Sequence, residues 1–240
     1  MASFPSRNNG IYLSSLKYSD TSIYDEIYGY IPITEIELKI IDTPVFQRLN
    51  HIRQLGTAYR VFPGAQHTRF SHSLGVMYIM DRMITSKNLE GRINEDERQR
   101  LRLAALLHDV GHYPLSHIIE TVMTDHNLKK ERKHERFGEY VVTHSSIKDI
   151  LSEQYNPEEI TDIFTGESSE PLFNQLMSSD LDADRIDYLL RDSVHTGVAY
   201  GKFDLNRLMH TLNLDKNGLL CIESGGRHAS EGYIVGRYLM

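Results

Sequence analysis

The sequence is poor in several features, and each shortage narrows what the protein can be. It contains no tryptophan and a single cysteine, Cys221, among 240 residues. One cysteine excludes an intrachain disulfide and is typical of a reducing compartment, so we expect a cytoplasmic protein. No apolar run approaches the roughly 18 residues that a membrane-spanning helix needs. The polar N-terminus, residues 1–10, also lacks the layout of a signal peptide. We therefore expect no membrane association.

Positive charge is also in short supply. The chain has 26 Lys and Arg residues against 33 Asp and Glu residues, for a net charge of -7. Broad, sequence-independent nucleic-acid binding depends on neutralising phosphates, so nucleic acid is not indicated as a partner. A few local arginines can still hold a small anion. The twelve histidines are numerous, and their positions carry more information than their count.

Helix signals outnumber strand signals along the chain. Helical apolar spacing or end signals mark segments 34–42, 43–56, 71–86, 101–108, 137–150, 158–164, 171–192, 204–212 and 230–240, with a break expected near Ser178. Extended pieces are expected around a turn in 23–33 and in a hairpin over 213–223. Strands and helices do not alternate, and no repeat or linker divides the chain. We therefore predict a mainly α fold, a helical bundle with minor short β-hairpins, as a single domain over 1–240.

One stretch near the middle of the chain carries the strongest chemical signal. A nearly all-apolar run, 103–107, ends in His108 and Asp109. Polar groups at the end of a buried helix are costly unless something binds them, and a metal ion satisfies both. His72 lies on the apolar face of the segment 71–86, so we expect it to point inward as well. A lone inward histidine is usually a hydrogen-bonded core residue, but two on separate helices beside an aspartate favour a metal site.

The acidic segment 180–192 offers a further ligand. At 100° per residue, one arc of a helix holds four of its side chains: Asp184, Arg185, Tyr188 and Asp192. Asp182 and Asp187 fall outside this arc. A solvated acidic surface is the ordinary interpretation, but a tyrosine, an arginine and two carboxylates on one half-buried face fit it less well. We predict Asp184 as the fourth ligand.

The donor set indicates the kind of metal and the chemistry near it. Two imidazoles and two carboxylates suit Mg²⁺ or a six-coordinate first-row ion better than a closed structural zinc site. We therefore predict one divalent metal ion as cofactor, with Mg, Mn, Fe, Ni and Zn as candidates. His112, His117 and His134 are candidate proton donors or phosphate ligands, and Glu120 can orient one of them. Arg69 can neutralise a phosphate. Spacing alone favours a structural role and a functional role equally for each of these residues.

The ordered set His72, His108-Asp109 and Asp184 resembles the signature of the HD superfamily of metal-dependent phosphohydrolases. Narrower similarity to its deoxynucleoside triphosphate triphosphohydrolase branch lies in Phe46–Gly56, Phe62–Ala65, Arg69–Gly75, His108–His117 and Asp184–Asp192. The similarity runs from about Ile23 to Phe203. Relatives in this branch continue past the position of Met240, so we expect the chain to stop before the family's C-terminal part.

The resemblance implies a reaction and a set of roles. The reaction is hydrolysis of a dNTP to the deoxynucleoside and inorganic triphosphate, by attack of water at the α-phosphorus, in a homo-oligomer. The implied metal ligands are His72, His108, Asp109 and Asp184. The implied catalytic and phosphate-contacting histidines are His112, His117 and His134, with Glu120 where an aspartate is usual. Arg69 and Arg185 match phosphate contacts. Gln54, Tyr188 and Asp192 match residues that hold the sugar, where a tyrosine face leaves a 2′-hydroxyl no room.

Two other interpretations remain open from the sequence. One keeps the metal site but changes the substrate to a nucleoside monophosphate, a cyclic dinucleotide or another phosphate ester. The other is a truncated, non-catalytic nucleotide-binding scaffold, which the end of the chain at Met240 favours. The intact metal set and the three candidate histidines argue against the scaffold.

Overall fold

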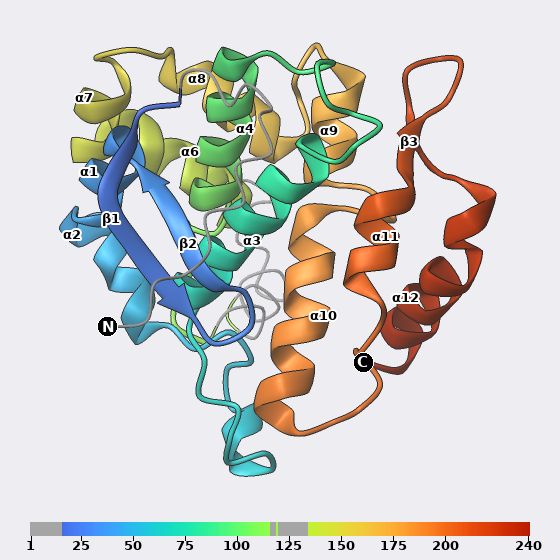
Figure 1. Ribbon diagram of the computed structural model, residues 1–240. Coiled ribbons are helices and arrows are strands. Elements are labelled where there is room, and N and C mark those ends of the chain that lie inside the picture. The colour runs from blue at the N-terminus through green and yellow to red at the C-terminus, as the bar shows by residue number, and fades with distance from the viewer. Residues whose placement is uncertain (1–15, 116–118, 120–133) are drawn as a thin grey trace, which may run out of the picture.

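The computed structural model describes residues 16–115, 119 and 134–240. Helices make up most of these residues, and the described strands form two short antiparallel hairpins (Figure 1). The predicted mainly α fold with minor hairpins is therefore confirmed. His117 and Glu120, two of the predicted catalytic residues, lie outside the described residues.

The elements follow one another in short steps along the chain. The first hairpin pairs β1 (Tyr18–Asp25) with β2 (Gly29–Thr34), and the second pairs β3 (Leu212–Leu214) with β4 (Leu220–Ile222). The α-helices are α1 (Glu35–Ile41), α2 (Pro44–Gln47), α3 (Arg69–Ile84), α4 (Glu95–Leu107), α6 (His134–His144), α7 (Ser146–Leu151), α8 (Pro157–Thr165), α9 (Pro171–Met177), α10 (Ala183–Thr196), α11 (Leu205–Thr211) and α12 (Arg227–Leu239).

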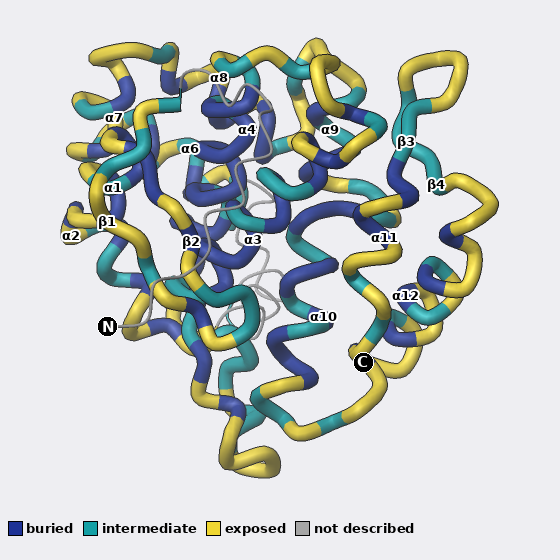
Figure 2. The backbone as a smooth tube through the Cα atoms, in the orientation of Figure 1, coloured by how far each residue is buried: buried dark blue, intermediate teal, exposed yellow. Residues whose placement is uncertain are grey.

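Helix α3 is the centre of the core. It packs against both α4 and α10, and Figure 2 shows it buried along most of its length. Val76, Ile79 and Met83 are fully buried, as the apolar spacing of this segment predicted. Because α4 ends and α10 begins beside α3, polar residues from three distant parts of the sequence are brought to one place.

Helix α4 begins earlier than predicted. The polar segment 90–100 was expected to precede the helix, but the helix starts at Glu95. Asn94 and Glu97 form a reciprocal capping box, and the acidic first turn is favoured by the helix dipole. The prediction of a start at Leu101 was wrong because it followed apolar spacing and overlooked the cap.

The predicted helix over 43–56 is the other clear departure. Helix α2 ends at Gln47, a single 3₁₀ turn covers Arg48–His51, and Ile52 is extended. The backbone of this segment pairs instead with the residues that precede α3, because Arg69 N–H donates to the Ile52 carbonyl at 2.9 Å. Arg53 and Thr68 form an isolated bridge in the same place. Tertiary pairing thus overrides the apolar i, i+3 pattern, and it carries Gln54 to the start of α3.

Several other predicted boundaries are confirmed. Thr34 caps α1 with a capping box, and the break expected near Ser178 separates α9 from α10. Asp204 caps α11, and Gly218 takes the left-handed conformation in the turn between β3 and β4. The segment 137–150 is two helices rather than one, since Ser145 ends α6 and caps α7. Helix α12 starts at Arg227, before the predicted Ser230.

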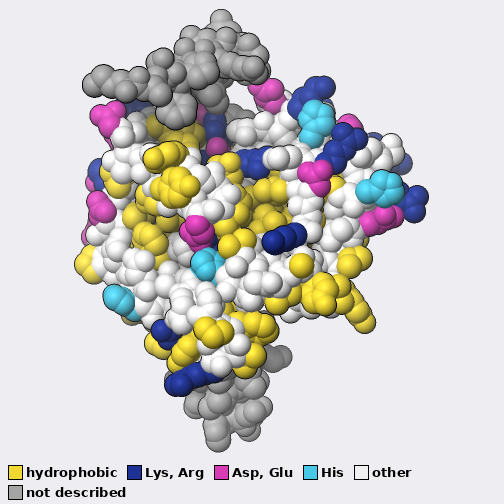
Figure 3. Space-filling model, turned by 60° about the horizontal axis from the view of Figure 1, so that its bottom comes forward, with side chains coloured by type: hydrophobic (Ala, Val, Ile, Leu, Met, Phe, Trp, Pro, Cys, Tyr) yellow, Lys and Arg dark blue, Asp and Glu magenta, His cyan; other side chains and the backbone are white. Residues whose placement is uncertain are grey.

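The surface adds two observations. None of the helices in the described parts of the chain is long and apolar enough to cross a membrane. On the face shown in Figure 3, Lys and Arg side chains are scattered among acidic and hydrophobic ones and do not gather into a stripe.

Candidate metal centre

Four side chains from α3, α4 and α10 converge where these helices meet: His72, His108, Asp109 and Asp184. We call them the metal centre. His72, His108 and Asp109 each offer a ligand atom, and these three atoms lie within 4.8 Å of one another. Asp184 joins them, because its Oδ1 lies 3.0 Å from His72 Nε2 and 3.8 Å from His108 Nε2. The structure therefore brings together all four residues that the sequence nominated as ligands.

His108 shows how well this group suits a cation. Its Nδ1 donates to the Ala105 carbonyl at 2.8 Å, which leaves Nε2 with a lone pair. That Nε2 atom is buried and has no hydrogen-bond partner in the part of the chain that the structure describes. It faces Asp109 Oδ1 at 3.5 Å and Asp184 Oδ1 at 3.8 Å. A buried acceptor nitrogen among carboxylate oxygens is costly unless a cation binds there, so the donor set fits a divalent metal.

His72 is held in place from behind by Asp187. The Nδ1 atom donates to Asp187 Oδ2 at 2.7 Å, so Nε2 is directed toward Asp184 and Asp109. Burial lowers the pKa of His72, but the two carboxylates Asp184 and Asp187 outweigh it and raise the pKa to about 10. A cation bound at this nitrogen would therefore have to replace a proton.

Asp187 itself belongs to a fully buried ion pair. It accepts from Arg191 Nε at 2.9 Å and from the Tyr28 hydroxyl at 2.8 Å. Burial acts to raise the pKa of Asp187, but Arg191 holds it well below the usual range. Gly75 of α3 leaves room for this pair, because a Cβ there would overlap both Asp187 and the Arg191 guanidinium.

The sequence placed Asp187 outside the functional arc of its helix, and that prediction missed its role. The sequence prediction considered the faces of α10 alone, and the spacing within one helix does not show that α3 packs against a second face. Asp187 lies on this second face, against His72. A histidine ligand needs a partner for its other ring nitrogen, and this general requirement is the signal that could have identified the residue.

Asp109 is surrounded by positive or polarisable groups. The Arg69 guanidinium forms an ion pair with its Oδ2, and His112 Nε2 lies 3.2 Å from its Oδ1. Burial acts to raise the pKa of Asp109, but Arg69 and the imidazoles of His108 and His112 hold it well below the ordinary value. The carboxylate is therefore ionised at neutral pH, as a metal ligand must be.

His112 and His134 form a stacked pair beside the metal centre. Their ring centroids are 3.9 Å apart and the planes differ by 18°. Gly111 permits this approach, because a Cβ there would overlap the His134 carbonyl and the Gly138 backbone nitrogen. Burial lowers the pKa of His112 to about 4, although Asp109 opposes the shift. His112 is therefore neutral near pH 7, with one ring nitrogen that donates a hydrogen bond and one that accepts.

A pocket of about 290 Å³ opens from the metal centre. Its lining contains nine of the predicted site residues: Gln54, Arg69, His108, Asp109, His112, His134, Asp184, Arg185 and Tyr188. Phe164, Met177 and Ser178 add walls that the sequence did not nominate. His72 lies behind the lining, and Asp192 is not among the lining residues. The pocket therefore joins a cation-binding group to cationic, aromatic and amide side chains.

Asp182 and Arg185 shape the rim of this pocket at the start of α10. Asp182 accepts from the backbone N–H of Arg185 at 2.8 Å and so caps the helix. The Arg185 side chain donates to the Ser179 carbonyl at 2.7 Å and to Asp182 at 3.1 Å. Burial, and secondarily Asp184, raises the pKa of Asp182 to about 7. Asp182, which the sequence left outside the arc, is thus a capping residue that also anchors an arginine of the pocket.

The sequence model of the HD domain matches residues 69–192, just over half of the chain. This range runs from Arg69 to Asp192 and contains every residue of the metal centre. The chain belongs to the HD-domain family. The resemblance first read from the ordered histidines and aspartates is therefore confirmed.

Individual HD relatives extend this result. An uncharacterized Bacillus subtilis protein, YwfO, is 36% identical over 231 residues, which are 93% of this chain and 51% of YwfO. Human deoxynucleoside triphosphate triphosphohydrolase SAMHD1 is 33% identical over 220 residues, 78% of this chain and 35% of SAMHD1. A solved phosphohydrolase structure from Bacteroides thetaiotaomicron superposes with a TM-score of 0.79 at 35% identity, covering 92% of this chain and 53% of that one. The chain thus spans about half the length, or less, of the curated relatives that it matches.

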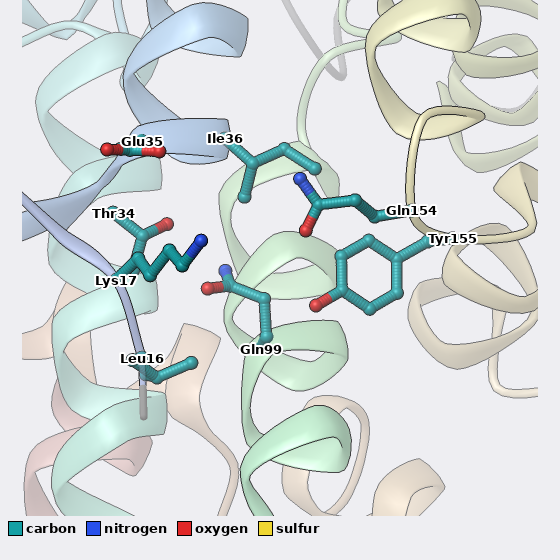
Figure 4. A pocket seen from close by; sticks show the side chains of 8 residues that line it. All are labelled: Leu16, Lys17, Thr34, Glu35, Ile36, Gln99, Gln154 and Tyr155. Atoms are coloured by element: carbon teal, nitrogen blue, oxygen red, sulfur yellow. The ribbon is translucent and has the colours of Figure 1, made fainter. Parts of the chain in front are cut away.

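The HD-domain chain also has a second pocket that the metal centre does not use. It measures about 260 Å³ and is lined by Leu16, Lys17, Thr34, Glu35, Ile36, Gln99, Gln154 and Tyr155 (Figure 4). Among the residues that the structure describes, its lining has no histidine, and Glu35 is the only carboxylate. Because it lacks metal ligands and shares no lining residue with the first pocket, we assign it no part in the site.

Proposed function

We propose that this HD-domain chain hydrolyses deoxynucleoside triphosphates to the deoxynucleoside and inorganic triphosphate. One observation carries the proposal: a single pocket joins the metal centre to Arg69, Arg185, Tyr188 and Gln54. Cation, phosphate and sugar ligands are thus available in one cavity. The name of the SAMHD1 relatives, deoxynucleoside triphosphate triphosphohydrolase, supports the same reaction.

In this proposal His72, His108, Asp109 and Asp184 hold one divalent metal ion, with Mg, Mn, Fe, Ni and Zn as candidates. When bound, the ion supplies a Lewis acid that polarises a phosphoryl oxygen and makes water more acidic. Asp187 fixes the ring of His72, and the Ala105 carbonyl fixes the ring of His108. The protein's own part is to hold both imidazoles as ligands before the substrate arrives.

The phosphates are assigned to the cationic and imidazole groups of the pocket. Arg69 and Arg185 present planar guanidinium groups, which bind phosphate oxygens in a fixed geometry. His112 is neutral because burial lowers its pKa to about 4, and its one N–H faces the Asp109 carboxylate. We therefore assign His112 to holding Asp109 in place at the phosphate end of the pocket, and His134, stacked on it, to the phosphate contact. His117 and Glu120, outside the described residues, are proposed as the catalytic pair on the family resemblance.

The sugar is assigned to Gln54, Tyr188 and Asp192. Tyr188 lies one helical turn beyond Asp184, so its ring covers the pocket next to the metal centre. A ring packed against the sugar leaves no room and no partner for a 2′-hydroxyl, which selects deoxyribose. Gln54 Oε1 is buried without a hydrogen-bond partner while the residue lines the pocket, so it can accept from a sugar hydroxyl.

The test starts with metal analysis of the purified chain, followed by a screen of the four dNTPs, the four NTPs and the deoxynucleoside monophosphates. Each is tried with every candidate metal after chelation, and products are separated by anion exchange. We expect triphosphate release from deoxy substrates only. Release of phosphate from a monophosphate would point instead to another HD phosphohydrolase activity. Bound metal without turnover of any substrate would point to the scaffold. Light scattering on the same sample tests the proposed homo-oligomer.

A further inference from the structure

We infer that His67 is a positioning residue for sugar recognition, although it neither lines the pocket nor belongs to the metal centre. It holds the side chain of Asp192 and the backbone of Gln54, two of the three residues proposed to hold the sugar, and we assign this pair to the sugar 3′-hydroxyl. The inference rests on the proposed function, because only a deoxynucleotide substrate would bring a sugar into contact with these two residues. It adds a residue that the sequence did not nominate and that lies outside the matched HD range.

The first contact is between side chains. His67 Nε2 lies 2.8 Å from Asp192 Oδ1, and the His67 side chain is only 1% exposed. A carboxylate only accepts, so the ring nitrogen donates the hydrogen. Asp192 lies two helical turns beyond Asp184 on the same face of α10. One oxygen of Asp192 is therefore tied down, and its rotamer is fixed before any ligand binds.

The second contact is through the backbone. The His67 carbonyl accepts from the Gln54 N–H at 3.1 Å, within the pairing that replaces the predicted end of the 43–56 helix. The neighbouring Arg53 and Thr68 form a bridge that continues this pairing. Gln54 thus reaches the pocket on a short extended segment that His67 anchors. One residue thus contacts both proposed sugar ligands, which lie far apart in the sequence.

The ring of His67 is itself immobilised. It stacks on His195 with a centroid separation of 4.5 Å and an interplanar angle of 23°. His195 Nε2 in turn lies 2.8 Å from Glu26 Oε1. Gly64 completes the packing, because a Cβ there would overlap the His195 carbonyl. A donor held on several sides keeps an acceptor within the narrow range of positions that recognition of a hydroxyl requires.

The test compares His67→Leu with wild type on a dNTP and on the matching 2′,3′-dideoxynucleoside triphosphate. Loss of a hydrogen bond to a charged group is expected to raise KM for the dNTP about tenfold or more, with little change in kcat. The dideoxy substrate has no 3′-hydroxyl, so its KM is expected to stay the same in both proteins. His67→Gln keeps an N–H donor near the position of Nε2 and should restore most of the loss.

His195→Leu is the matched control, because it makes the same change in the stacked pair but leaves the donor to Asp192 in place. It should raise KM for the dNTP less than His67→Leu does, because the hydrogen bond to Asp192 remains although the ring is held less firmly, and it should leave KM for the dideoxy substrate unchanged. Metal content and the melting temperature of each variant are measured alongside. If His67→Leu weakens both substrates equally, or if wild type does not distinguish them, the inference is wrong and the proposed function stands. If wild type hydrolyses no nucleoside triphosphate with any metal, both fail.

Discussion

Two groups of buried charges lie in the same helical core and differ in how their charges are matched. The first, which we call the paired cluster, consists of Glu37, Arg102 and Asp81. Glu37 and Arg102 are joined at 2.7 Å, and Arg102 also lies 3.2 Å from Asp81. Both Glu37 oxygens are satisfied, since Oε1 also accepts from Gln99 and Oε2 from the Thr34 backbone. This cluster ties α1 to α4 and α3, and nothing in it remains to bind a ligand.

The metal centre differs in what remains unsatisfied. Some of its charges are paired, as Asp109 is with Arg69, but its donor atoms converge on one another, and His108 Nε2 has no hydrogen-bond partner among the described residues. Asp109 and Asp184 are both held in the ionised state, because the pKa of each lies below its ordinary value against the effect of burial. Burial of charged groups alone therefore does not identify a binding site. Acceptor atoms that lack a hydrogen-bond partner and converge on one point do identify one.

The largest expected effect is the loss of activity in Asp109→Asn. The substitution keeps the size of the side chain but removes an anionic ligand. We therefore expect the bound metal to fall below about one tenth of the wild-type content and the rate of hydrolysis to fall at least about a thousandfold. Metal analysis and triphosphate release measure both. Helical circular dichroism should persist, since the core around α3 is apolar.

The matching change in the paired cluster is Glu37→Gln. It leaves the buried Arg102 guanidinium without its main counter-charge, so we expect the free energy of unfolding to decrease by about 3–5 kcal/mol. Chemical denaturation measures this loss. Activity per mole of bound metal should remain as in wild type at a temperature where the variant is folded. Equal activity losses in Glu37→Gln and Asp109→Asn would show that the contrast between the two clusters is wrong.

The sequence predicted some residues of the site and not others, and the difference lies in whether a residue's role depends on local or on distant structure. The residues of the metal centre were predictable from local sequence: spacing within a helix sets the direction of His72 in α3 and Asp184 in α10, and His108 and Asp109 directly follow the apolar end of α4. Asp187 and His67 were not predictable in this way. Their roles depend on which helix faces them and on pairing between segments far apart in sequence, and neither leaves a periodic signal.

The fold shows the same limit. Caps and turns such as Thr34 and Gly218 act within a few residues, and the helix or hairpin predicted at each was confirmed. The end of α2 was missed because the segment after Gln47 turns extended to pair with the residues before α3. Patterns of apolar residues report burial, and Leu49 and Ile52 are indeed buried. These patterns do not show whether the backbone hydrogen bonds are made within a helix or with a segment that is distant in sequence.

An intermediate effect is expected for Asp187→Asn, which tests whether a charged partner outside the metal centre supports it. The amide cannot stabilise the His72 ring as the carboxylate does, and the ring loses its fixed orientation. We expect metal affinity to fall roughly 10–100-fold, less than in Asp109→Asn, as is usual for residues behind a histidine ligand. Competition with a chromophoric chelator measures the affinity. An unchanged affinity would contradict the role assigned to Asp187.

The smallest expected effect is a pH dependence that only the metal centre should show. In the metal-free protein the pKa of His72 is raised to about 10, well above its ordinary value of 6.5. A raised pKa stabilises the folded state below pH 6.5, and this contribution is lost as the pH rises through 10. Because a metal ligand must be the neutral imidazole, metal binding near pH 7.5 should release about one proton, and affinity should rise about tenfold per pH unit. Titration calorimetry in buffers of different ionisation enthalpy counts the proton. Glu37→Gln should release the same number, since the paired cluster takes no part in this exchange, and a metal that binds without proton release would contradict the ion pairing assigned to His72.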